Sequence, residues 1–272
     1  MTTPLIACSR MYNVSPEVTA AWDALFAYVS TQADVPFKMM YHAFPDPIED
    51  LWVRPDMGCV LMCGYPYARA NPRPTLLATP VPAFPQYEHK AVYFTHLLVA
   101  EDSPFQTIED TFGHRISWTI ENSQSGFNAL RTFLLSYRTP DRPNLYRASI
   151  GPIGTFTVGV EGIHNDEIDV VPIDSFSYDL MQLYTPEKLA GTRVIATTGA
   201  APFPPLVAKH SLEDVVADRL RDVLLHAHTA SSLQPHFETM KLERFTTVTT
   251  ETYETTLAQA RIADEADYPF PA

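Results

Sequence analysis

The stretch RISWTIENSQSGFNALR, residues 115 to 131, decides how the rest of the chain is interpreted. Its first part, Ile116 to Ile120, has the character of a short buried strand, and apolar residues recur at helical spacing from Gly126 onward. The sequence therefore predicts a strand that passes into a helix through residues 123 to 126.

The residues of this junction suit an anion. Ser123 and Ser125 each carry a hydroxyl, Gln124 lies between them, and Gly126 has no β-carbon that would keep an oxyanion away from the backbone. The first amides of a helix have no acceptor inside the helix and lie at the positive end of its dipole. We therefore expect the junction to bind an oxyanion, although either serine would also serve as an ordinary helix cap.

The composition of the whole chain limits the class of protein. The 272 residues are 46% hydrophobic and 11% aromatic, which is enough for one large core or two smaller ones. The 19 Lys and Arg against 32 Asp and Glu give a formal charge of -13, whereas nucleic acids and anionic membranes bind basic surfaces. We expect a soluble globular protein that has no nucleic-acid partner.

The start of the chain and its cysteines bear on the compartment. Apolar residues 5 to 8 form too short a run for a signal peptide, and no run of about 20 apolar residues predicts a membrane-spanning helix. On this pattern a cytoplasmic location stays open. Cys8, Cys59 and Cys63 are expected to be buried free thiols.

The first hundred residues predict an α/β lobe. Leu5 to Ser9, Phe37 to Tyr41 and Gly58 to Met62 have the character of buried strands. Ser15 followed by Pro16 predicts a helix start between the first two strands. Strands that alternate with helices indicate a parallel sheet, and ligands of such sheets bind beyond the carboxyl ends of the strands.

Two of these strand ends carry candidate ligand contacts. Arg10 and Tyr12 follow the first strand, and an aromatic turn with Tyr65 and Tyr67 follows the third. Arginine can hold a carboxylate or phosphate through two hydrogen bonds, and tyrosine can stack on a ligand or bond to it. Each tyrosine can equally pack a turn fixed by proline, so both interpretations stay open.

Changes of composition after Val99 and at Gly191 predict a second lobe inserted into the first. The inserted part ends in a strand from Ile168 to Ile173, and Asp174 follows as a helix cap or a ligand contact. Ser211 with Asp214 resembles a capping box for a later helix. We expect lobe 1 to comprise residues 1–98 and 192–272 and lobe 2 to comprise residues 99–191, joined by a two-segment hinge.

The sequence resembles the PhnD-like periplasmic substrate-binding proteins of phosphonate ABC transporters over essentially its full length. The likeness rests on short motifs between residues 102 and 175, which are Asp102-Ser103-Pro104, Ile108-Glu109-Asp110 with Gly113, Ser123-Gln124-Ser125-Gly126, Glu167-Ile168-Asp169-Val170 and Ile173-Asp174-Ser175. The resemblance implies a type II periplasmic-binding-protein fold of the α/β class, with two mixed sheets flanked by helices and an interlobe cleft.

The same resemblance implies a binding site. In the family, the Ser-x-Ser-Gly turn holds the phosphonate oxygens, tyrosines of the first lobe close over the ligand, and an acidic residue near the Asp174 position holds an amine. The residues that match are Ser123, Ser125, Gly126, Tyr12, Tyr65, Tyr67 and Asp174, and Gln124 and Arg10 complete the candidate set on their chemistry. Residues 149 to 155 depart from the family because they lack a histidine that members often carry there.

Three functions follow as hypotheses. The first is a solute-binding protein that closes on a phosphonate, phosphate-like or carboxylate anion and delivers it to an ABC permease in the periplasm, without a cofactor. The second is a soluble sensor of the same ligand. The third is a cytoplasmic enzyme on the same two-lobed frame, similar to menaquinone-pathway or dehydratase proteins, for which His42, His96 and Asp174 are the candidate acids and bases. No metal-binding spacing, nucleotide loop or hydrolase elbow is present in the sequence.

Overall fold

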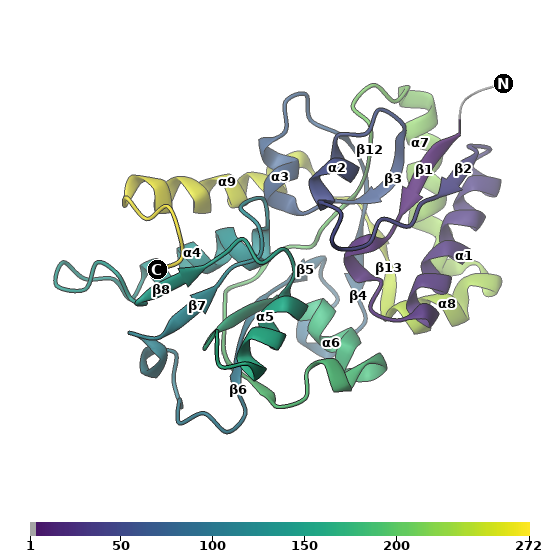
Figure 1. The fold of residues 1–272 in the computed structure, drawn as a ribbon. Coiled ribbons are helices and arrows are strands. Elements are labelled where there is room, and N and C mark those ends of the chain that lie inside the picture. The colour runs from purple at the N-terminus through teal and green to yellow at the C-terminus, as the bar shows by residue number, and fades with distance from the viewer. Residues whose placement is uncertain (1–3) are drawn as a thin grey trace. The chain divides into compact units, whose positions relative to one another are not determined.

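Alternating strands and helices dominate the computed structural model, which describes residues 4–272 (Figure 1). The chain forms two units. Unit 1 contains the residues up to Val92 together with Pro202–Tyr253, and unit 2 contains Tyr93–Ala201 together with Glu254–Ala272. Residues 254–272, which the sequence assigned to lobe 1, therefore belong with the inserted part, and the chain passes between the units three times rather than twice.

Unit 1 is built on a six-stranded mixed sheet in the order β13-β4-β12-β3-β1-β2. Strands β2, β1 and β3 run parallel, whereas β12 and β13 pair antiparallel with their neighbours. The strands of this sheet are β1 (Leu5–Cys8), β2 (Phe37–Met39), β3 (Met57–Leu61), β4 (Thr75–Pro82), β12 (Leu206–Ala208) and β13 (Leu242–Thr246). The parallel part is the arrangement that the first hundred residues predicted.

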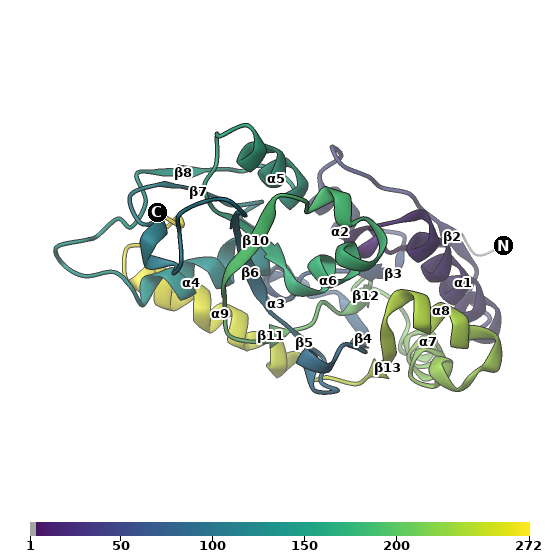
Figure 2. The same cartoon turned by 90° about the horizontal axis from the view of Figure 1, so that it is seen from below.

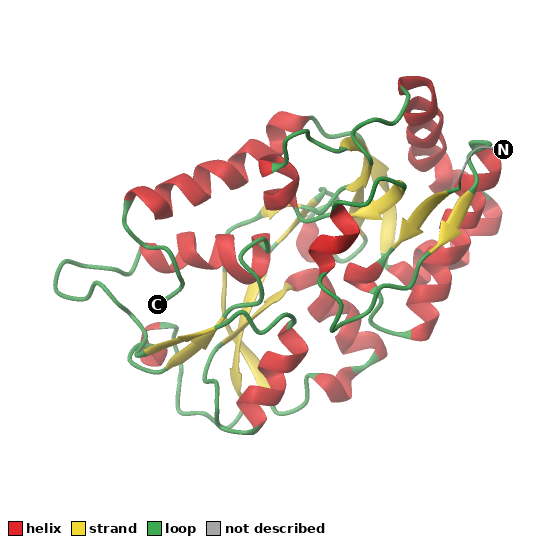
Figure 3. Ribbon diagram, turned by 45° about the horizontal axis from the view of Figure 1, so that its top comes forward, coloured by secondary structure: helices red, strands yellow, loops and turns green. Residues whose placement is uncertain are grey.

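Helices lie on either side of these strands (Figure 3). Helices α1, α7 and α8 pack together (Figure 2). The helices of unit 1 are α1 (Pro16–Gln32), α2 (Ile48–Trp52), α3 (Gly64–Arg69), α7 (Asp214–His226) and α8 (Gln234–Met240), with single 3₁₀ turns at η1 (Arg10–Tyr12), η2 (Pro85–Tyr87), η6 (Ala227–Thr229) and η7 (Ser231–Leu233). The start of α1 is as predicted, because Ser15 Oγ accepts a hydrogen bond from the Val18 amide and Pro16 occupies the first turn.

Two local expectations in unit 1 were wrong. The aromatic turn after β3 is helix α3, in which the Tyr67 amide donates to Cys63 O at 3.1 Å. A proline is tolerated there because the first turn of a helix needs no amide from it. Ser211 does not cap α7, since the helix begins at Asp214 after Glu213 and no side chain caps it.

Unit 2 contains two groups of strands, in which β7, β8 and β9 run parallel to one another. Strands β10, β6 and β9 pair antiparallel, and β7 pairs parallel with β8. A parallel bridge between Ile116 and Val170 joins the two groups, with the Ser117 amide 2.9 Å from Val170 O. The strands are β6 (Thr95–Ala100), β7 (Arg115–Ser117), β8 (Ala148–Ile150), β9 (Val171–Asp174) and β10 (Thr192–Thr197), while β5 (Val92–Tyr93) and β11 (Ala201–Pro202) lie where the chain passes between the units.

Unit 2 contains the helices that follow its parallel strands and most of the last helix of the chain, whose residues 250–253 belong to unit 1. They are η4 (Gln124–Asn128), which continues directly into α4 (Ala129–Leu135), then α5 (Phe156–His164), α6 (Ser175–Tyr184) and the final helix α9 (Thr250–Glu265), with 3₁₀ turns at η3 (Glu109–Thr111) and η5 (Pro186–Lys188). Helix α9 runs alongside η4 and α4 (Figure 1). Phe127, Leu130 and Leu134 of these helices are buried in the core of the unit together with Ile116 and Trp118.

Candidate functional site

The carboxyl ends of three parallel strands meet in unit 2. Strands β7, β8 and β9 end at Ser117, Ile150 and Asp174, and each is followed along the chain by a helix. In open α/β sheets this edge is where ligands bind, because the loops that follow the strands and the first turns of the helices lie there together. The candidate site is therefore this edge.

The loop after β7 enters its helix in an unusual way. Ser123 Oγ accepts a hydrogen bond from the Gly126 amide at 2.8 Å, so Ser123 is the helix cap. The Asn128 amide reaches back five residues to Ser123 O at 3.0 Å, which makes the first turn a π turn. The helix thus begins at Gln124, two residues earlier than expected. Turns of this kind are frequent at functional sites.

The two serines of the turn have different freedom. Ser123 Oγ already accepts a hydrogen bond, but its proton is available to a further acceptor. The hydroxyl of Ser125 makes no hydrogen bond to any residue from 4 to 272, while Ser125 O accepts one from Thr95 Oγ1 at 3.0 Å. The backbone of Ser125 is therefore fixed to strand β6, and its side chain is free to bind a ligand.

Gly126 is required by packing. A β-carbon on this residue would lie 2.1 Å from Thr119 Oγ1, which is far inside van der Waals contact. The Thr119 amide also donates to Gly126 O at 3.2 Å. The space left by the missing β-carbon is thus taken by a threonine side chain that the motif did not predict. The Gly126 amide is not open to an anion, because Ser123 occupies it.

Gln124 is a structural residue in this turn. Its side chain is fully buried, donates to Gln259 Oε1 at 2.7 Å and accepts from Asn128 Nδ2 at 2.8 Å. Both ends of the amide are used in fixing helix α9 against the turn. We therefore remove Gln124 from the candidate ligand contacts.

Asp174 stands between a capping role and a ligand role. Its Oδ1 accepts a hydrogen bond from the Ser177 amide at 2.8 Å, which makes it the cap of α6. Its strand neighbour is Thr95, the residue that bonds to Ser125 O, so the carboxyl belongs to the same edge of the sheet as the Ser125 turn. Burial raises the pKa of Asp174 to about 6.

The segment after β8 lacks the family histidine and offers hydroxyls instead. Thr155 caps α5 by accepting a hydrogen bond from the Thr157 amide at 3.1 Å, and its hydroxyl lies 2.7 Å from the Thr157 hydroxyl. The Gly154 amide donates to Thr119 O at 3.0 Å. This segment is thereby joined to the loop after β7.

The remaining candidate contacts lie in unit 1. Arg10 is half-buried in the turn after β1, its Nη1 is buried without an acceptor among residues 4 to 272, and burial lowers the pKa of its guanidinium. Tyr12, two residues further on, is fully buried and packs on Phe203 with ring centroids 5.3 Å apart. Arg10 is therefore the stronger ligand candidate of the two.

Tyr65 and Tyr67 both lie in α3 with arginines close to their rings. Arg69 stacks over Tyr65 at 5.1 Å, and Arg73 lies 5.7 Å from the centroid of Tyr67. Tyr67 is fully buried and packs edge-on against Tyr253 at 5.0 Å, whereas Tyr65 keeps a small exposed area. The predicted closure of either tyrosine over a ligand stays a prediction.

The candidate acids and bases do not form a catalytic pair. His96 Nδ1 lies 2.8 Å from Thr197 Oγ1, and burial lowers the pKa of His96 to about 4. In the ladder of β6 and β9, His96 faces Ile173 and is one residue out of phase with Asp174, so the two side chains point to opposite faces of the sheet. His42 belongs to unit 1, is partly buried, and has its Nε2 2.8 Å from Pro47 O.

Two of the motifs that carry the family resemblance lie at the opposite end of the parallel strands. Arg115, the first residue of β7, binds Asp169 through two side-chain hydrogen bonds of 2.8 and 2.9 Å. Arg193 donates to the backbone of Ser103 and of Phe105 and so fixes the loop before β7. A cavity of about 520 Å³ between these groups contains none of the predicted site residues. These motifs therefore stabilise the sheet at the end away from the candidate site.

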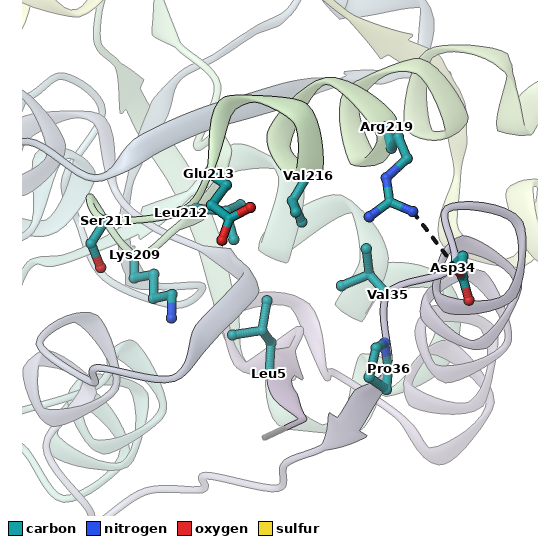
Figure 4. Close-up of a pocket in the computed structure, with 10 residues that line it drawn as sticks. All are labelled: Leu5, Asp34, Val35, Pro36, Lys209, Ser211, Leu212, Glu213, Val216 and Arg219. Atoms are coloured by element: carbon teal, nitrogen blue, oxygen red, sulfur yellow. Dashed lines mark ion pairs between the residues drawn. The ribbon is translucent and has the colours of Figure 1, made fainter. Parts of the chain in front are cut away.

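A second cavity, of about 410 Å³, lies in unit 1 and also lacks the predicted site residues (Figure 4). Its floor is aliphatic, with Leu5, Val35 and Val216, and Arg219 reaches Asp34 at 3.9 Å on its rim. Asp34 is almost fully exposed, so this ion pair contributes little.

The structure also bears on metals and membranes. Within residues 4 to 272, no group of three or more His, Cys, Asp or Glu side chains is placed to hold a metal ion. None of the helices in that range is both long enough and apolar enough to span a bilayer. Cys8, Cys59 and Cys63 are buried and free, as the sequence predicted.

Comparisons with known proteins agree with this picture. Residues 12–253 match the family model described as the periplasmic substrate-binding protein of phosphonate ABC transporters. No curated protein sequence matches the chain.

Solved structures share the fold at low sequence identity. A binding-protein component of a phosphonate ABC transporter from Pseudomonas aeruginosa is 17% identical, with a TM-score of 0.80 over 98% of this chain and 88% of that one. PhnD1 from Prochlorococcus marinus in complex with methylphosphonate is 15% identical, with a TM-score of 0.77 over 96% and 98%. A Xanthomonas citri protein bound to ATP is 16% identical, with a TM-score of 0.68 over 98% of each chain.

Proposed function

Because the chain belongs to the periplasmic substrate-binding protein family of phosphonate ABC transporters, we propose that it binds a small oxyanion at the turn of residues 123 to 126. The observation that carries this proposal is the free hydroxyl of Ser125 at the start of a helix, beside the carboxyl ends of three parallel strands. Hydroxyls and helix amides together favour a negatively charged oxygen.

Phosphonates and phosphate are the ligands that the site suits best. The related PhnD1 protein holds methylphosphonate, and the fold is the same at low identity. Asp174 adds an acidic group, which favours either a ligand that also carries an ammonium or an oxyanion that keeps a proton. We place Ser123, Ser125 and Asp174 in this site and retain Arg10, Tyr12, Tyr65 and Tyr67 as predicted contacts to be tested one at a time.

Membership of the family also suggests the partners and the compartment. Such proteins deliver small anions to ABC permeases, so we propose a permease as the protein partner and the periplasm as the location. We propose binding without catalysis, since His96 and Asp174 point to opposite faces of their sheet. Co-purification with a permease tests the partner, and cell fractionation tests the location.

A thermal-shift panel tests the ligand proposal. We expect at least one of methylphosphonate, 2-aminoethylphosphonate, phosphite, phosphate, sulfate and malate to raise the melting temperature, and ATP joins the panel because a similar structure holds it. A ligand at about 100 times its Kd adds roughly 2.7 kcal/mol of stability. Removing the Ser125 hydroxyl takes away a hydrogen bond to a charged group, which is worth about 1.5 to 3 kcal/mol and should remove most of that shift.

Ser211→Ala is the matched control, because Ser211 is an exposed serine of unit 1 and should leave the shift unchanged. Gly126→Val is a second probe of the same turn. If Ser125→Ala and Gly126→Val both keep the full ligand-induced shift, the turn is not the anion site.

A further inference from the structure

We propose that Thr119 is a further ligand-binding residue and that its hydroxyl makes the site selective for tetrahedral oxyanions over planar carboxylates. The inference rests on the proposed function and concerns a residue outside the Ser-x-Ser-Gly motif. Three observations support this role: the position of the Thr119 side chain, the lack of a hydrogen-bond partner for its hydroxyl, and the side from which it approaches the turn.

The backbone of Thr119 is fixed on both sides. Its amide donates to Gly126 O at 3.2 Å, and its carbonyl accepts from the Gly154 amide at 3.0 Å. Thr119 therefore lies between the start of η4 and the segment that leads into α5, the two loops that follow β7 and β8. The backbone that carries this side chain is thus fixed beside the turn, and a β-branched side chain has few allowed rotamers.

The side chain of Thr119 lies directly against Gly126. Thr119 Oγ1 is 2.1 Å from the place where a β-carbon of Gly126 would be, so the hydroxyl touches the α-carbon of the glycine. On the same glycine, the amide is bonded to Ser123 Oγ at 2.8 Å. Two hydroxyls therefore flank Gly126, one from the strand side and one from the helix cap.

The hydroxyl of Thr119 has no partner in the described chain. The residue is only 8% exposed, yet its Oγ1 makes no hydrogen bond to residues 4 to 272. Valine would fill the same space, so packing alone does not require the hydroxyl. The hydroxyl is not sealed inside the protein, because it is absent from the fully buried polar atoms that lack a partner. A ligand oxygen at the turn would supply the missing hydrogen bond.

The direction of approach suggests what the third hydroxyl does. A carboxylate presents two oxygens in one plane, whereas a phosphonate or phosphate presents at least three that spread around the phosphorus. Ser123 and Ser125 come from the helix side of the turn, and Thr119 comes from the strand side across Gly126. A tetrahedral group can therefore place a third oxygen against the Thr119 hydroxyl while Ser123 and Ser125 bind the other two, whereas a carboxylate has no third oxygen to place there.

The test compares Thr119→Val, which keeps the shape and removes the hydroxyl, with Thr119→Ser, which keeps the hydroxyl. The probes are methylphosphonate, inorganic phosphate, sulfate and acetate, and the readouts are Kd by calorimetry and the melting temperature without ligand. We expect Thr119→Val to weaken binding of the tetrahedral probes by tenfold or more, to leave acetate binding unchanged within twofold, and to melt no lower than the wild type. Thr119→Ser should bind the tetrahedral probes within about threefold of the wild type.

Several outcomes would overturn the inference. If Thr119→Val binds methylphosphonate and phosphate as the wild type does, the hydroxyl holds only water. If it weakens acetate and phosphate equally, Thr119 does not select geometry. If Thr119→Val melts well below the wild type, the residue acts through stability. These results are distinguishable from failure of the proposed function, in which the wild type binds none of the probes or Ser125→Ala binds them normally.

Discussion

Asp174 is a helix cap in the structure and a ligand contact in the proposed site. Its carboxyl caps α6 through the Ser177 amide, and burial raises its pKa to about 6. A neutral carboxyl donates a hydrogen bond to an anion, whereas a carboxylate repels the anion and attracts an ammonium. In the proposed site, the protonation state of this residue would decide which ligands are accepted near neutral pH.

Folding stability should depend on pH through Asp174. Its pKa in the folded protein, about 6, lies above the ordinary value of 3.8, so the folded state holds the proton more tightly than the unfolded chain does. The stability from this group is complete below about pH 4 and is lost as the pH rises through about 6. We expect Asp174→Asn to remove roughly 1 to 3 kcal/mol of this pH dependence, measured by urea unfolding between about pH 4 and 7. Identical pH profiles for the two proteins would contradict the assignment.

At the scale of the element, the junction between β7 and η4 is held together by a close contact. Thr119 occupies the space beside Gly126, and a β-carbon there would approach Thr119 Oγ1 to 2.1 Å. Core packing tolerates such an approach only if the backbone or the side chain moves. The glycine and the threonine therefore constrain each other.

A double-mutant cycle measures this constraint. We expect Gly126→Ala to destabilise the wild type by roughly 1 to 3 kcal/mol, and to cost about 1 kcal/mol less in a Thr119→Ala background, because the clashing atoms are then absent. Gly199→Ala is the control, since no atom lies within 4 Å of a β-carbon there, and it should cost about 0.5 kcal/mol or less. Additive effects of the two substitutions in urea unfolding would show that the contact carries no energy.

Structural features could be predicted from the sequence where the residues that determine them are neighbours in the chain. The start of α1 was predictable because Ser15 and Pro16 act on the first turn of their own helix. The turn after β3 was misread because a helix through Pro66 looks the same in sequence as a proline turn. Ser211 failed as a cap because the chain turns between it and the first residue of α7.

The same distinction between local and distant determinants applies to the candidate site. The position of the Ser123 turn followed from local pattern, and the family match confirms the expected type II periplasmic-binding-protein fold. The roles of single residues did not follow, because they depend on partners far away in the chain. The side chain of Gln124 is hydrogen-bonded to Gln259, 135 residues away in the sequence. Thr119 becomes a candidate contact only in the structure, where its side chain lies beside Gly126.

At the scale of the whole molecule, the end of the chain completes unit 2. Buried Arg131 donates through Nη1 to Asp264 at 2.9 Å and to the carbonyls of Tyr268 and Pro269 at 3.2 Å. The sequence placed residues 254–272 in lobe 1 because the choice of unit is made by distant polar partners of this kind, which local pattern does not reveal.

Removing Arg131 should therefore loosen the carboxyl terminus. We expect Arg131→Ala to destabilise the protein by about 2 to 3 kcal/mol in urea unfolding, because a buried arginine and three acceptors lose one another. Arg147→Ala is the matched control, since Arg147 is exposed and makes no side-chain hydrogen bond or ion pair within residues 4 to 272, and it should stay within about 0.5 kcal/mol of the wild type. Equal stabilities for the two variants would show that the terminal segment contributes little.

The clamp of Arg115 on Asp169 stands at one end of the parallel strands, and the loops that carry the hydroxyls stand at the other. The residues that stabilise the sheet and the residues proposed to set ligand preference therefore lie in different stretches of the chain. Mutational libraries at Thr119 and Ser125, which leave the tightly packed Gly126 and Gly151 in place, should yield variants with altered ligand preference while expression levels hold, and such variants would be starting points for engineered oxyanion biosensors.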